Sequence, residues 1–281
     1  MRRATAGRTQ WGPSAWLQMR GSPEILAASH RCLQGIQVRR TLEHRPLAQY
    51  DNCVEMKGWR ADDFGSFDKG EAAFFQAEVG RLLAGRKAET PVRVLELGFG
   101  NGAFMGWARQ EEFEILGTEI QPELRRRAES LGFEVAGQVE GIETASLDAC
   151  VAFDVFEHIP HDELIMLCKE IHRCLKPGGH LVARFPNGDS PFSMPNWNGD
   201  ATHKSWLGQN SIAHIMEQSG LDLVELRAPS EPCITPKDYL TRPLKLSLRS
   251  GFRLLAKAAF LGGSAPATFH MNYMLHSTKR G

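Results

Sequence analysis

The sequence of 281 residues contains no apolar run of 18 residues, so no segment is long and apolar enough to span a bilayer as a helix. Its start also lacks the apolar segment of a secretion signal. None of its six cysteines forms a Cys-x-x-Cys pair, the spacing typical of zinc and redox motifs. We therefore expect a cytoplasmic protein whose cysteines are reduced, structural thiols.

The formal net charge is zero, but the charges are unevenly distributed along the chain. Residues 1–48 contain eight Arg and two Glu, and residues 237–281 contain eight Lys or Arg and one Asp. The stretch between them holds 17 basic and 30 acidic residues. An acidic centre does not offer the continuous basic stripe of a nucleic-acid groove, so we expect no nucleic-acid partner.

Composition and the positions of turn-forming residues divide the chain into four parts. We expect residues 1–48 to form a basic, poorly ordered extension, with an Arg-rich transit-like leader as the alternative. Residues 49–90 are predicted to form a helical lid, and residues 91–236 the core domain, in which strands and helices alternate. Residues 237–281 are predicted to form a basic amphipathic helix and a final strand.

One stretch carries most of the functional information. The apolar run Val92–Leu97 contains Glu96 and opens into three glycines at alternate positions, Gly98, Gly100 and Gly102. Such a strand-to-helix turn lets the backbone approach a nucleoside closely. The spacing is not the Gly-x-Gly-x-x-Gly of dinucleotide-binding proteins. A carboxylate just before the glycines also suits a cationic ligand better than a pyrophosphate.

The segment Glu96–Gly102 resembles motif I of the class I S-adenosylmethionine-dependent methyltransferases, usually written E/D-x-G-x-G-x-G. Three later segments match the same family in order: Leu116–Ile120, a strand ending in an acid; Asp148–Ile159, a strand followed by the Glu-His-Ile of one family branch; and Leu175–Phe185, a Lys-Pro-Gly-Gly turn and the fifth strand. The resemblance covers about residues 58–228. The alternative is an α/β domain whose glycines only make turns.

The resemblance implies a Rossmann-like, doubly wound, seven-stranded, mainly parallel sheet with an antiparallel last strand, and S-adenosyl-L-methionine as the cofactor. It also implies eight cofactor-binding residues. Glu96, Gly98, Phe99, Gly100 and Gly102 shape the methionine side, Glu119 accepts the ribose hydroxyls, Ile120 packs on the adenine, and Asp154 lies near the methionine end. The residue that binds the adenine amine is not assigned, since residues 137–140 are ambiguous.

The periodicity of apolar residues predicts the remaining elements. We expect helices over 68–83, 162–174 and 211–219, with Gly220 ending the last of them. Residues 221–226 and 272–276 are predicted strands. Residues 239–261 are predicted to form a helix with basic residues on one side and leucines on the other. Such a helix either packs on the domain or makes peripheral contact with the inner face of a membrane.

The long segment Pro186–Trp206 leaves the carboxyl end of the fifth strand, where ligands bind in open α/β sheets. We expect its His203 to act as a general base with Asp200 orienting the ring, although an ordinary loop histidine is an equal alternative. His158 is a further catalytic candidate, or else a structural residue that caps the next segment. Asp200 and His203 are too few ligands for a metal site, so none is expected.

Two tryptophans of the same segment, Trp197 and Trp206, either stack on a sugar or ring-shaped acceptor or hold the loop in place. The pattern Asn-x-Asp-Ser-Pro-Phe followed by Gly-Asp-x-Thr-His is similar to methyltransferases of bacterial surface-polysaccharide gene clusters. We therefore expect a small-molecule or saccharide acceptor and O-methylation of a sugar hydroxyl. The alternatives are methylation of a phenol or an amine, a nucleotide-binding oxidoreductase, and a non-catalytic cofactor-binding relative; the oligomeric state stays open.

Overall fold

The structure is a computed structural model, and it describes residues 63–86 and 91–281. These residues all belong to one compact unit that spans 48–281. The predicted extension over residues 1–48 and the first part of the predicted lid lie outside the described residues.

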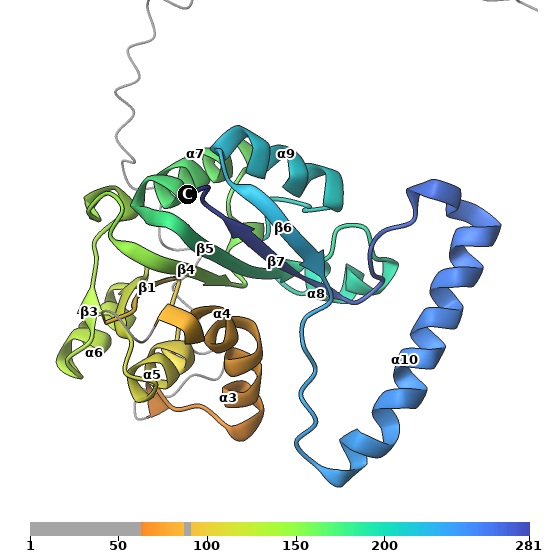
Figure 1. Cartoon of the computed structure of the whole chain (residues 1–281), viewed down its shortest axis with the longest axis horizontal. Helices are drawn as coiled ribbons and strands as arrows, with labels where there is room; N and C mark the ends of the chain where they lie inside the picture. Colours follow the sequence, from red (N-terminus) through yellow and green to blue (C-terminus); the bar gives the residue numbers. More distant parts are fainter. Residues whose placement is uncertain (1–62, 87–90) are drawn as a thin grey trace, which may run out of the picture. The chain divides into compact units, whose positions relative to one another are not determined.

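A seven-stranded sheet forms the centre of the described chain, in the order β3-β2-β1-β4-β5-β7-β6 (Figure 1). Neighbouring strands from β3 to β5 are parallel, and β7 runs antiparallel to both β5 and β6. The predicted Rossmann-like fold class is therefore confirmed. The strands are β1 Arg93–Leu97, β2 Glu114–Thr118, β3 Glu134–Val135, β4 Leu147–Phe153, β5 Leu175–Pro186, β6 Asp222–Arg227 and β7 Asn272–Thr278.

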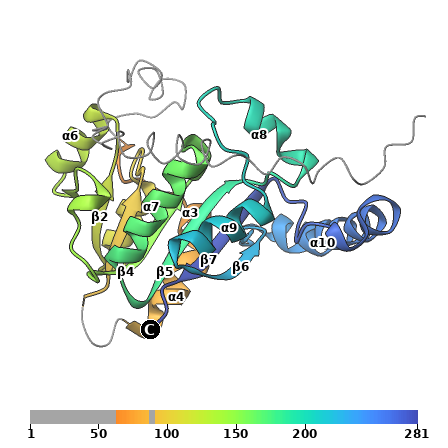
Figure 2. The same ribbon diagram turned by 90° about the horizontal axis from the view of Figure 1, so that it is seen from above.

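The sheet separates two hydrophobic cores because successive side chains of a strand point to opposite faces. In β1, Val94 belongs to one core, whereas Leu95 and Leu97 belong to the other. The first core packs against the helices before β3, and the second packs against α7 and α9, so helices cover both faces (Figure 2). Burial on both faces explains why β1 and β4 are almost continuously apolar.

The helices lie close to their predicted positions. Their bounds are α3 Lys69–Phe75, η3 Gln76–Gly80, α4 Arg81–Leu83, η4 Ala84–Arg86, α5 Ala103–Gln110, α6 Pro122–Ser130, η5 Val139–Gly141, η6 Phe156–His158, α7 His161–Cys174, η7 Pro191–Ser193, α8 Met194–Asn198, α9 Gln209–Ser219, α10 Pro236–Ala256, η8 Lys257–Leu261 and η9 Gly262–Ser264. As predicted, α9 ends at Gly220, which adopts a left-handed conformation with φ of 78°.

Two segments differ from their predictions. The Lys-Pro-Gly-Gly segment lies within β5 instead of preceding it, since Gly178 and Gly179 pair through their backbones with Lys279 at the other end of the chain. The segment after β5 is not a continuous loop, because η7 and α8 form inside it. Ser190 accepts a hydrogen bond from the Phe192 N–H and so caps η7. The many turn-forming residues of this segment predicted a loop, so the short helix was not expected.

The described part of the predicted lid is a helical segment over α3, η3 and α4. Asp68 and Glu71 form a capping box at its start, which satisfies two backbone N–H groups. Phe75 packs against Phe104 and Trp107 of α5, with ring centroids 5.3 and 5.7 Å apart. This segment therefore packs on the sheet through α5; its covering of a cofactor stays a prediction.

No helix within residues 63–86 and 91–281 is long and apolar enough to cross a membrane. The longest of them, α10, carries no buried residue. It contacts the rest of the unit through Phe252, whose ring lies 5.4 Å from the rings of both Phe192 and Phe269. Arg249 also donates a hydrogen bond of 2.7 Å to Glu231, which anchors the same side of the helix.

Candidate active site

The glycine turn joins β1 to α5 and requires glycine for conformational reasons. Gly98, Gly100 and Gly102 have φ values of 63°, 52° and 72°, in the left-handed region that other residues rarely adopt. A Cβ on Gly98 would lie 2.8 Å from a methyl group of Val155, and one on Gly102 would lie 2.6 Å from the Phe64 ring. The turn is thus packed from both sides by protein.

Glu119 follows β2 and fastens the same turn. Its two carboxylate oxygens accept hydrogen bonds from the backbone N–H groups of Gly100, at 3.0 Å, and Gln121, at 2.9 Å. Each carboxylate oxygen keeps a second lone pair for a ligand hydroxyl. The next side chain, Ile120, is 56% exposed, so a large apolar surface lies open beside the carboxylate.

Glu96 is almost fully buried under the turn, at 5% exposure. It accepts a hydrogen bond from the backbone N–H of Met105 in the first turn of α5. The N-cap residue of this helix is Gly102, which has no side chain to cap it. Its Oε2 atom has no hydrogen-bond partner in the described chain. Burial, together with the nearby Glu119 carboxylate, raises the pKa of Glu96 well above its usual range. A cation nearby would relieve both effects.

Phe99 is placed differently from the other predicted cofactor residues. Its side chain is buried at 3% exposure and packs edge-to-face on Phe64, with ring centroids 5.9 Å apart. A Cβ on Gly117 would lie 2.5 Å from its ring. Only the backbone of Phe99 is therefore in a position to meet a ligand, and its side chain supports the turn from below.

Asp154 directly follows β4 and adopts a left-handed conformation with φ of 57°. Strain of this kind in a residue other than glycine is typical of functional sites. Its carboxylate forms an ion pair with Arg184 of β5, and Nε of Arg184 donates a hydrogen bond of 3.1 Å to it. The backbone N–H of Asp154 donates a hydrogen bond to the Arg184 carbonyl. Sequence reasoning missed Arg184, although a charged residue near the end of the predicted fifth strand was a usable signal.

Asp200 is linked through the Thr202 hydroxyl to the ring of His158, whereas the sequence predicted that it orients the ring of His203; only its backbone carbonyl accepts a hydrogen bond from the His203 N–H. Burial opposes ionisation, but hydrogen bonds from Thr202 hold the pKa of Asp200 below its usual range. The Thr202 hydroxyl donates a hydrogen bond of 2.5 Å to the ionised carboxylate. Its oxygen therefore accepts a hydrogen bond of 2.8 Å from Nδ1–H of His158. This chain fixes the tautomer of His158 and places a lone pair on its Nε2.

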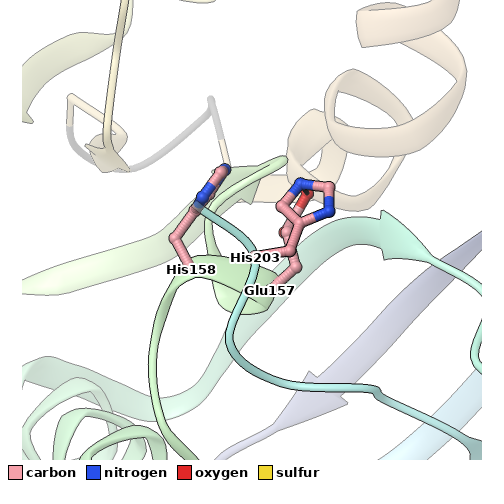
Figure 3. Close-up of side chains that lie close together, drawn as sticks. All are labelled: Glu157, His158 and His203. Atoms are coloured by element: carbon pink, nitrogen blue, oxygen red, sulfur yellow. Dashed lines mark ion pairs between the residues drawn. The ribbon is translucent and has the colours of Figure 1, made fainter. Parts of the chain in front are cut away.

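His203 lies beside His158, and their ring centroids are 4.8 Å apart (Figure 3). Its Nδ1 lies 3.2 Å from the Trp197 carbonyl oxygen, and since a carbonyl only accepts, Nδ1 carries the proton. Its Nε2 lies 4.0 Å from a carboxylate oxygen of Glu157, which the sequence offered among the polar candidates after the fourth strand without a catalytic role. The site therefore joins η6, which supplies Glu157 and His158, to the loop after α8.

The two tryptophans hold the loop together. Their ring centroids are 4.5 Å apart, and Trp206 donates a hydrogen bond of 2.5 Å from Nε1 to the Gly188 carbonyl. Trp206 nevertheless stays 37% exposed. The loop is also fastened to the segment before β7, where the Asn187 amide donates to the Thr268 and His270 carbonyls. Stacking on an acceptor stays a prediction.

A cavity of about 790 Å³ lies beside β3, at the edge of the sheet. Its lining includes residues 136–138, part of the segment in which the sequence left the adenine contact unassigned. None of its lining residues belongs to the glycine turn or to the histidine pair. The strained and buried polar groups converge instead at the carboxyl ends of β1, β4 and β5, which are therefore the candidate active site.

Comparisons with known proteins show the family and the fold of the chain. A family model of the methyltransferase domain matches residues 67–226, so the chain belongs to this methyltransferase family. No curated protein sequence matches the chain. One similar solved structure is a SAM dependent methyltransferase from Archaeoglobus fulgidus, with a TM-score of 0.52, 19% identity, and coverage of 74% of this chain and 94% of that chain.

A second similar structure is the 1,6-didemethyltoxoflavin-N1-methyltransferase of Burkholderia thailandensis, solved with 1,6-didemethyltoxoflavin and S-adenosylhomocysteine bound. Its TM-score is 0.50 at 13% identity, with coverage of 93% of this chain and 92% of that chain. At these identities the likeness shows the fold alone. Family and fold together indicate an S-adenosylmethionine-dependent methyltransferase, and S-adenosylmethionine is its cofactor.

The residues of the glycine turn fit this cofactor. The partnerless oxygen of Glu96 suits a ligand that carries positive charge. The remaining lone pairs of Glu119 suit two adjacent hydroxyls, and exposed Ile120 suits the face of a base. The individual contacts of the eight residues named from the sequence stay predictions.

Proposed function

We propose that this protein transfers a methyl group from S-adenosylmethionine to a hydroxyl group of a sugar. The observation that carries the proposal is the polar cluster at the carboxyl ends of β4 and β5, where His158 and His203 lie side by side. A partly exposed indole ring, Trp206, belongs to the same loop. A polar cluster beside an aromatic surface suits a saccharide, which has hydroxyl groups and an apolar ring face.

The cofactor, when bound, supplies a methyl group that its sulfonium already activates. The protein's residues therefore need to align the acceptor oxygen, exclude water and remove the hydroxyl proton. In the balanced reaction the oxygen–methyl bond forms, the sulfur–methyl bond breaks with its electron pair left on sulfur, and the hydroxyl loses its proton. We assign the removal of the proton to His203 and His158, with Asp200 acting through Thr202.

Resemblance of the loop after β5 to methyltransferases of surface-polysaccharide gene clusters supports the saccharide. The alternative is a small phenol or amine, which the toxoflavin-type neighbour favours, since that protein binds a small heteroaromatic molecule. A non-catalytic relative that retains the cofactor is the third reading.

The test is a methyl-transfer screen with labelled cofactor over nucleotide sugars, lipid-linked saccharides, phenols and amines. The proposal predicts transfer to a saccharide, and its loss in His203→Ala with binding of S-adenosylhomocysteine intact. His214→Ala, a change of an exposed histidine on α9, is the matched control and should leave the rate unchanged. Transfer to phenols or amines alone would overturn the sugar assignment, and binding without any turnover would favour the non-catalytic relative.

We further propose that α10 makes peripheral contact with an anionic membrane surface on the cytoplasmic side. The helix is anchored through Phe252 and Arg249, and most of its leucines lie away from that side. The exposed fractions of five of them are 85% for Leu240, 62% for Leu244, 65% for Leu248, 70% for Leu254 and 65% for Leu255. A contiguous exposed leucine face of this kind typically marks a surface that contacts a membrane or another protein.

The charge on α10 and η8 supports an anionic bilayer as the covering surface. Residues 236–261 contain six Lys or Arg and one acidic residue, Asp238. At 100° per residue, Arg242, Lys245 and Arg249 fall on the side opposite the leucines. A basic polar face opposite a leucine face is typical of helices that lie in the membrane interface. A lipid-linked saccharide would then be presented next to the domain.

A further inference from the structure

The search for additional sites leads to the group formed by Glu157, His158 and His203. One carboxylate oxygen and one ring nitrogen of each histidine all lie within 4.8 Å of one another. The sequence suggested only Asp200 and His203 as ligands, which are too few for a metal. The fold adds Glu157 and His158 and moves Asp200 behind Thr202, so three potential ligands converge, two imidazoles and one carboxylate.

The hydrogen bonds around the histidines are those of metal ligands. Histidines that bind a metal usually donate their other ring N–H to a carbonyl or a carboxylate, which fixes the tautomer. His203 donates from Nδ1 to the Trp197 carbonyl, and His158 donates from Nδ1 to Thr202, which is held by Asp200. Nε2 of each ring therefore carries a lone pair suited to a cation.

The spacing of His203 and Glu157 is close to that of two ligands of one cation. Nε2 of His203 and Oε1 of Glu157 both carry lone pairs and lie 4.0 Å apart, with side-chain exposures of 8% and 3%. That separation is too long for a hydrogen bond. Two ligands on a tetrahedral metal with bonds of about 2.1 Å lie roughly 3.4 Å apart. Closing the gap to that value takes a shift of only about half an ångström.

From this geometry we infer that Glu157, His158 and His203 bind a divalent transition-metal cation. Two imidazoles and one carboxylate suit zinc, iron, cobalt, nickel or manganese better than magnesium or calcium, which prefer oxygen ligands alone. Three protein ligands leave coordination positions open. If the proposed function holds, on which this step rests, an open position would take the acceptor's hydroxyl and promote loss of its proton to water, and His158 and His203 would then act as ligands in place of the base assigned above.

The full-length protein, stripped with a chelator, is titrated with Co²⁺, followed by calorimetry and by visible absorbance. We expect one Co²⁺ per chain with a spectrum of low coordination number. His203→Ala and Glu157→Gln should each weaken Co²⁺ binding at least 100-fold, and Thr202→Val should weaken it about 10–100-fold, the range for partners of metal-bound histidines. Thr202→Ser, which keeps the hydroxyl, should restore binding, and His214→Ala should not change it.

Absence of Co²⁺ binding by the wild-type protein would overturn the inference, as would binding that persists unchanged in His203→Ala and Glu157→Gln. In that case a protonated His203 forms an ordinary ion pair with the Glu157 carboxylate. Binding of S-adenosylhomocysteine checks that each variant is folded and separates the two proposals. Cofactor binding and methyl transfer without Co²⁺ binding would remove the metal alone, whereas Co²⁺ binding without methyl transfer to any acceptor would remove the proposed function alone.

Discussion

The backbone N–H of Gly100 donates a hydrogen bond of 3.0 Å to the carboxylate of Glu119, which joins the glycine turn after β1 to the end of β2. The same carboxylate accepts the Gln121 N–H. One side chain thus sets the shape of the turn and presents free lone pairs beside exposed Ile120. The shape of the glycine turn therefore rests on this connection as well as on the glycines.

Replacing Glu119 with Ala is expected to weaken binding of S-adenosylhomocysteine about 10–100-fold. Hydrogen bonds to a charged group contribute about 1.5–3 kcal/mol, and the turn also loses its fastening. Isothermal titration calorimetry provides the measurement. Glu123→Ala, which removes an exposed carboxylate from α6 nearby, is the control and should bind as the wild type does. Equal affinity for both variants would contradict the ribose assignment.

Replacing Gly98 with Ala should destabilise the protein by more than replacing Gly132 with Ala. Both glycines have positive φ, 63° and 74°, so both variants share the backbone strain of about 1–2 kcal/mol. Only at Gly98 does the new Cβ meet an atom at 2.8 Å, the Val155 methyl, whereas nothing lies within 4 Å at Gly132. Overpacking adds about 1–3 kcal/mol, measurable as a difference in urea unfolding.

If Gly98→Ala and Gly132→Ala unfold at the same urea concentration, the turn has room for a side chain, and the packing argument fails. A second reading comes from ligand binding. Gly98→Ala should also weaken S-adenosylhomocysteine binding, because the turn must move away from Val155, while Gly132→Ala should leave the affinity unchanged.

Asp148 should make stability depend on acid pH. Burial opposes ionisation, but the Lys176 ammonium at 2.6 Å, the Arg93 N–H and the Arg86 guanidinium hold the pKa of Asp148 below its usual range. A depressed folded-state pKa stabilises the native protein at pH values above the unfolded-state pKa of about 3.9, and this contribution is lost as the pH falls through the folded-state pKa.

Asp148→Asn is therefore expected to lower the free energy of unfolding at pH 7 by about 2 kcal/mol and to flatten its fall below pH 4. The measurement is urea unfolding at a series of pH values from 3 to 7, with Glu129→Gln, an exposed carboxylate on α6, as the control. An unchanged acid slope in Asp148→Asn would show that other carboxylates dominate.

The membrane proposal is tested with vesicles. Wild-type protein should sediment with vesicles rich in phosphatidylglycerol and not with pure phosphatidylcholine, and binding should weaken as salt is raised. The double change Leu244→Glu and Leu248→Glu should abolish binding, while Gln218→Glu on α9 should not. No binding to anionic vesicles would refute the proposal. A dimer that disappears in the same double variant would assign the leucine face to a second copy.

Local sequence patterns determined much of this protein. Val79 and Leu83 in the first helix, Leu164 and Ile171 in α7, and the left-handed Gly220 after α9 follow from helical periodicity and from capping, which depend on near neighbours in the chain. The seven-stranded, mainly parallel sheet with an antiparallel last strand followed from the resemblance, and the structure confirms it.

The tertiary structure alone decided which polar side chains meet. Asp154 and Arg184 are thirty residues apart and pair because β4 and β5 are neighbours in the sheet. Asp200 is closer in sequence to His203, yet it holds His158 through Thr202, because the loop folds back over η6. The sequence alone therefore identified the cofactor turn, whose residues are contiguous, whereas the acceptor side needed the fold, because its groups come from two separate segments, η6 and the loop after α8.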